Sequence, residues 1–182
     1  MRVFGLLILV MAMSITGSSQ TQTSLLEREE FADLREAMKK YEERVLIGKA
    51  AEEAQVREVG IESFLLDDDA VGVVQQAARK VCSSDPIGIW VTALRLADAQ
   101  ARVKIAKKKL EEAEERLKKA ETQIKEDEQQ GTYSQENWEI FGGAELAYRW
   151  APTVHANSLK DVAEYTKLLN EGLGDCIAGC KQ

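Results

Sequence analysis

Residues 86–130 read PIGIWVTALRLADAQARVKIAKKKLEEAEERLKKAETQIKEDEQQ, and this stretch decides the fold. In steps of seven it repeats two core positions, one filled by large aliphatic residues and the other mostly by alanine. Such a heptad repeat predicts a coiled-coil helix. The large position holds Ile89, Leu96, Val103, Leu110, Leu117 and Ile124, and the small position holds Thr92, Ala99, Ala106, Ala113, Ala120 and Asp127.

The alanines indicate how this helix packs. A methyl group lets a facing backbone come close, and alternating large and small side chains interdigitate most easily with an antiparallel partner. Asp85 and Pro86 supply an N-cap and a first-turn proline, and Gly131 supplies the stop. At 1.5 Å per residue the helix is roughly 65 Å long. We therefore expect an elongated molecule with a close antiparallel helix partner.

The first residues have the pattern of a secretory signal peptide. One basic residue, Arg2, precedes an uncharged apolar run over residues 3–13, and small or polar residues follow. We predict a signal peptide over residues 1–19, too short for a membrane span, with cleavage after Gly17 or Ser19. Residues 20–24 then form a flexible leader and residues 25–182 a single helical domain, secreted to the extracellular space.

The charge balance narrows the choice of partner. The chain has 31 acidic and 24 basic side chains and a formal net charge of −7. An acidic surface repels nucleic acid and anionic lipid, so we expect neither to be bound. No second apolar run of membrane length follows the signal peptide, so no membrane span is expected.

Residues 25–66 form a second predicted rod. If continuous, it is roughly 63 Å long, and this match in length makes it the expected antiparallel partner of residues 86–130. Gly48 and Gly60 mark either the close approach of another backbone or breaks in the helix. Its apolar residues recur in helical steps, first at Phe31, Leu34, Met38, Tyr41 and Val45 and, after a shift of register, at Ile47, Ala51, Ala54, Ile61 and Leu65.

Two further helices complete the predicted fold. Residues 70–82 form a short helix that is apolar on too many sides for solvent, capped by one of the aspartates at 67–69 rather than forming a calcium loop with them. Residues 134–179 form a third rod, kinked and interrupted at Pro152, with Ser158 capping its restart. The expected architecture is all-α: an elongated antiparallel three-helix bundle, up-down-up, with a coiled-coil-like Leu/Ala seam and a short capping helix.

Three cysteines, Cys82, Cys176 and Cys180, are expected in an oxidising compartment. The up-down-up path brings all three to one end of the bundle. We therefore predict an intrachain disulfide from Cys82 to Cys176 or Cys180, and favour Cys176 because it continues the helical register of Val162 and Leu169. The cysteine left over is then available to link a second chain into a disulfide-linked homodimer.

The sequence carries no pattern typical of an enzyme. His155, the single histidine, lies far from the cysteines along the expected rods, which argues against a shared zinc site. Carboxylates are abundant on solvated faces, and no pair stands out for acid–base chemistry. Phosphate-binding loops and nucleophile motifs are missing from the sequence. We expect no enzymatic activity, no cofactor and no metal.

An aromatic group is the remaining candidate site, with Trp138, Phe141 and Tyr148 on one helix face and Trp150 nearby. Another face carries Ile140, Ala144, Ala147, Ala151 and Val154. Two apolar faces mean either a helix buried on both sides or one face left for a partner or ligand. We predict a non-enzymatic protein that binds an extracellular protein partner. The alternative is a carrier of a small hydrophobic ligand bound near Trp138–Trp150, which the close alanine packing disfavours.

Overall fold

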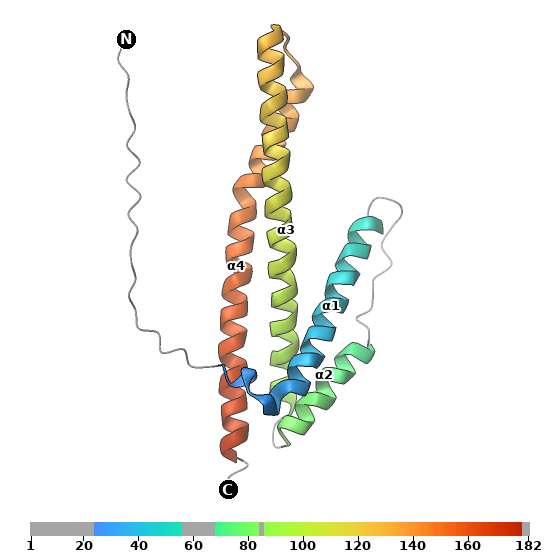
Figure 1. The fold of residues 1–182 in the computed structure, drawn as a ribbon, viewed down its shortest axis with the longest axis vertical. Helices are drawn as coiled ribbons and strands as arrows, with labels where there is room; N and C mark the ends of the chain where they lie inside the picture. Colours follow the sequence, from blue (N-terminus) through green and yellow to red (C-terminus); the bar gives the residue numbers. More distant parts are fainter. Residues whose placement is uncertain (1–23, 56–67, 84–85, 180–182) are drawn as a thin grey trace, which may run out of the picture.

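The computed structural model describes residues 24–55, 68–83 and 86–179. In these ranges the chain is all-helical, which confirms the predicted all-α class (Figure 1). The predicted signal peptide and most of the leader lie outside the described residues. The elements are two 3-10 turns, η1 (Leu25–Glu27) and η2 (Glu29–Phe31), and four α-helices, α1 (Ala32–Gln55), α2 (Asp68–Val81), α3 (Pro86–Gln130) and α4 (Gln135–Gly179).

Helices α3 and α4 form a long antiparallel hairpin that sets the shape of the molecule (Figure 1). Gly131 ends α3 with a positive φ of 66°, a conformation that glycine adopts without steric cost. The hydroxyl of Ser134 accepts a hydrogen bond from the backbone N–H of Asn137 at 3.2 Å and caps the start of α4. The turn is closed by the amide of Asn137, which donates to the Asp127 carboxylate at 2.7 Å.

Small residues hold the two helices of the hairpin close together. Beyond the reach of α1, α4 is the one described helix beside α3, and Ala113 and Ala120 are nevertheless buried there (Figure 1). A Cβ added at Gly172 would lie 2.9 Å from Cδ1 of Ile89, a separation that side chains do not tolerate without movement. We call Ala99, Ala106, Ala113 and Ala120 the α3 alanine seam. Across from it α4 presents Ala144, Ala151 and Ser158 at steps of seven residues, and Gly172, two steps further on, faces Ile89 before the seam begins.

Helices α1 and α2 pack on the base of the hairpin, meaning the end where α3 begins and α4 ends (Figure 1). They contribute to a compact apolar cluster that also contains the last turns of α4. The largest fully buried side chains of this cluster are Leu34, Val74, Cys82, Leu96, Leu169 and Leu173.

The first rod differs from the prediction in length and in direction. Asp33 near the start of α1 pairs with Lys80 beside the base at 3.0 Å, whereas Glu42 further along pairs with Lys104 of α3 at 2.9 Å. Helix α1 therefore runs parallel to α3, and the expected antiparallel packing of residues 25–66 on residues 86–130 is wrong. Because α2 carries the chain back to the base, the four helices run up, down, up and down (Figure 1).

The third rod differs in being continuous. Helix α4 contains Pro152 without a break, and Ser158 does not cap a new helix. Its hydroxyl instead donates to the backbone carbonyl of Val154 at 3.0 Å, as serine does inside a helix. Proline removes only one backbone donor, and the packing of α4 on α3 on both sides of Pro152 holds the helix in one piece.

Candidate interaction surface

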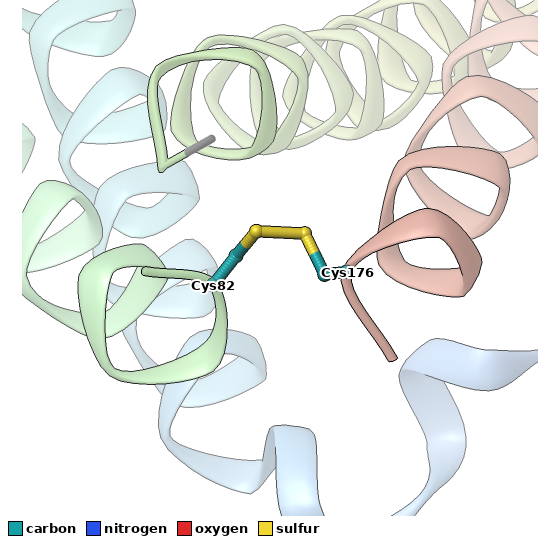
Figure 2. Close-up of a disulfide and its surroundings, with 2 residues drawn as sticks. All are labelled: Cys82 and Cys176. Carbon is teal, nitrogen blue, oxygen red and sulfur yellow. A yellow bond between two sulfur atoms is a disulfide. The ribbon is translucent and has the colours of Figure 1, made fainter. Parts of the chain in front are cut away.

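The predicted cysteine group lies at the base of the molecule. Cys82, just after α2, and Cys176, in the last turns of α4, form a disulfide with their Cα atoms 5.5 Å apart (Figure 2). Cys82 is fully buried and Cys176 is 5% exposed, so this bond is a structural link within the apolar cluster. It is the pairing that the register argument favours. Cys180 lies outside the described residues.

The predicted aromatic group does not come together as one cluster. Trp138 and Phe141 form an edge-to-face pair with ring centroids 5.9 Å apart. Trp150 is twelve residues beyond Trp138, which on an α-helix places it roughly 120° further around the axis. Tyr148, 38% exposed, is seven residues beyond Phe141 and lies on the same side of the helix, near the edge of the contact with α3. The four aromatic residues therefore flank α4 on two sides.

One flank of α4 forms an exposed apolar surface. Its large side chains are Ile140, Leu146, Trp150 and Val154, which are 55%, 58%, 63% and 53% exposed. Steps of three and four residues place them on one side of the helix. The helical pattern groups Ile140 and Val154 with the buried Ala144, but Phe141 and His155, one residue further on, are the partly buried ones. We call this surface the α4 apolar face, made of Ile140, Gly143, Leu146, Ala147, Trp150 and Val154.

The part of α4 that carries this face has far fewer charged side chains than the rest of the chain. From Ile140 to Leu159 the only charged side chains are Glu145 and Arg149, which pair with each other at 2.5 Å. The upper half of α3, at the same level, is mostly lysine, arginine and glutamate. A helix segment that is apolar nearly all round is normally buried. Helices α1 and α2 do not cover it, because they pack on α3 (Figure 1).

Other features of the described residues offer less chemistry. A shallow cavity of about 280 Å³ lies at the base beside the disulfide and is lined by Gly88, Thr92 and Leu168 among others. It is therefore distant from the predicted aromatic group on α4. No three His, Cys, Asp or Glu side chains in the described ranges gather closely enough to hold a metal ion. Across those same ranges, none of the helices combines the length and apolarity needed to cross a membrane.

Comparison with known proteins finds no protein-family model, no curated protein and no solved structure that matches this chain.

Proposed function

We propose that this chain is a secreted, non-enzymatic helical protein that acts by binding another protein through the α4 apolar face. The observation that carries the proposal is the exposure of Trp150, 63%, at the centre of an uncharged helix flank. Tryptophan is the residue most enriched among side chains that dominate binding energy at protein interfaces. Contiguous apolar surface on a water-soluble domain is typical of an interaction site.

The shape of the surface favours a protein partner over a small ligand. Small apolar molecules bind in concave pockets that enclose most of their surface. The α4 apolar face is the convex side of one helix, and the alanines of the α3 alanine seam are buried where α3 packs closely on α4. A helix face of this kind fits a groove or another helix on a partner.

Two features support an extracellular compartment. The Cys82–Cys176 disulfide is compatible with an oxidising environment. The apolar run over residues 3–13 has the pattern of a signal peptide. Both support a partner that is met outside the cell.

Affinity capture from the native extracellular fluid tests the proposal. Three baits lacking residues 1–19 are compared: the unmodified chain, Trp150→Glu, and Thr122→Glu, which adds the same charge on the exposed side of α3. We expect the unmodified and Thr122→Glu baits to retain the same protein, and Trp150→Glu to retain at least tenfold less. Circular dichroism confirms that each bait is folded.

Equal capture by the Trp150→Glu and Thr122→Glu baits would contradict the proposal. Tryptophan fluorescence, titrated with lipids and hydrophobic probes, covers the carrier alternative. Saturable quenching at micromolar ligand would favour a carrier instead.

A further inference from the structure

We propose that the α4 apolar face seats a second copy of this chain, so that two molecules pair through α4 in an antiparallel, twofold-symmetric dimer. This inference deepens the proposed function and rests on the same surface. Three properties of the described residues support a copy of the chain as the partner: charge, shape and the position of the surface along the hairpin.

Charge is the first property. The chain carries a net charge of −7, so two copies repel each other over most of their surface. The segment from Ile140 to Leu159 is the exception, because its single acidic and single basic side chain neutralise each other. Two α4 apolar faces can approach without desolvating an unpaired charge, a requirement for a buried contact between identical surfaces.

Shape is the second property. Gly143 is exposed, and nothing lies within 4 Å of a Cβ added there, so it leaves a depression in the helix surface. Trp150, seven residues further on, projects from the same side roughly 10 Å away. When a second copy lies antiparallel on the first, the large Trp150 of each copy can occupy the space left by the small Gly143 of the other.

A twofold axis near Ala147 satisfies both contacts at once. It places Trp150 of each copy over Gly143 of the other, and it brings Ile140 opposite Val154, since these two lie seven residues on either side of Ala147. In such an isologous interface one surface is complementary to itself, which is the commonest arrangement in protein dimers. The α4 apolar face has this property along its whole length.

The position of the surface is the third property. It lies on the part of the hairpin that α1 and α2, the other described helices, do not reach, so a second hairpin can pack there without meeting them (Figure 1). Two such hairpins make a four-helix arrangement that covers both copies of Trp150. The face is only about 20 Å long, so the contact is small and we expect a dissociation constant in the micromolar range.

Antiparallel pairing also distinguishes this non-covalent dimer from a disulfide-linked one. The bases of the two molecules point away from each other, so the C-terminal ends of the two α4 helices lie far apart. The dimer is therefore expected to form equally well when Cys180→Ser removes the covalent route. Experiments in this background measure only the non-covalent contact.

Analytical ultracentrifugation of the Cys180→Ser chain, lacking residues 1–19, over about 1 to 300 µM tests the inference. We expect a reversible monomer–dimer equilibrium. Gly143→Leu fills the depression and should weaken dimerisation at least tenfold, whereas Gly142→Leu, an identical change one residue away on another side of the helix, should leave it unchanged. Both changes replace a helical glycine with a better helix former, so loss of folding does not explain a difference.

Two results would overturn the inference: a monomer at every concentration, or equal dimerisation of the Gly143→Leu and Gly142→Leu chains. Neither would affect the proposed function if Trp150→Glu still abolished capture of another protein. Conversely, if the dimer forms but Trp150→Glu does not reduce capture of another protein, the dimer is supported and the proposed binding of a different protein is contradicted.

Discussion

Tyr41 shows how a single buried side chain links the fold to pH. It lies where α1 meets α3 and is only 7% exposed. Burial raises the pKa of its hydroxyl above the ordinary value, and the negative charge of Asp98 raises it further. In the unfolded chain the phenol ionises near pH 10, whereas in the folded chain it stays protonated to higher pH. Stability from this group is therefore complete below about pH 10 and is lost as the pH rises through the folded-state pKa.

Tyr41→Phe removes this contribution of Tyr41 to the pH dependence of stability. Urea unfolding is measured between pH 7 and pH 11, in the Cys180→Ser background so that thiol exchange does not interfere. We expect the free energy of unfolding to fall more steeply above about pH 10 in the parent chain than in Tyr41→Phe. Parallel curves for the two chains would mean that Tyr41 ionises as freely in the folded state as in the unfolded state.

At the scale of the helices, the α3 alanine seam is the feature that fixes the hairpin. Ala106 is 4% exposed against α4, whereas Lys108, two residues away, is exposed. Ala106→Leu should destabilise the fold by about 1–3 kcal/mol, because the larger side chain forces two close helices apart. Lys108→Leu should cost much less. Denaturant unfolding of both variants checks the prediction, and an equal loss would contradict close packing at Ala106.

The central helix was predictable because its signals are local. Its heptad pattern, its first-turn proline at Pro86 and its glycine stop at Gly131 place both ends where the structure has them. The Cys82–Cys176 pairing was also predictable from the sequence. It requires only that Cys82 precedes α3 and that α4, which is as long as α3, brings the chain back to the end where α3 begins. That requirement does not depend on the direction of α1.

The partner of α3 was not predictable from length alone. Matched length favours residues 25–66 as the partner, and the helical pattern groups Ala144 and Ala151 with Ile140 and Val154 on one face. An error of one residue in that register exchanges a buried position for an exposed one, since neighbouring residues point about 100° apart. The sequence therefore predicts an exposed apolar face on α4 only as one of two alternatives, the other being a helix buried on both sides.

At the scale of the whole molecule, the disulfide holds the C-terminal end of α4 to the base. It joins residues 94 positions apart, and in the chain-entropy model a loop of this size contributes about 4–5 kcal/mol by restricting the unfolded chain. Cys82→Ser combined with Cys176→Ser should lower the free energy of unfolding by up to about this amount. Cys180→Ser should have little effect. Non-reducing peptide mapping is the companion measurement, and a peptide linking Cys176 to Cys180 would contradict the pairing.

The central claim is that the α4 apolar face meets another protein surface, and site-specific photocross-linking tests it most directly. A benzoylphenylalanine replaces Leu146 in one chain and Thr122 in a second, and both are irradiated in the native extracellular fluid. We predict a discrete adduct from position 146, identified by mass spectrometry as a partner protein or a second copy of the chain, and no such adduct from position 122. No adduct from position 146, or the same products from both positions, would contradict the claim.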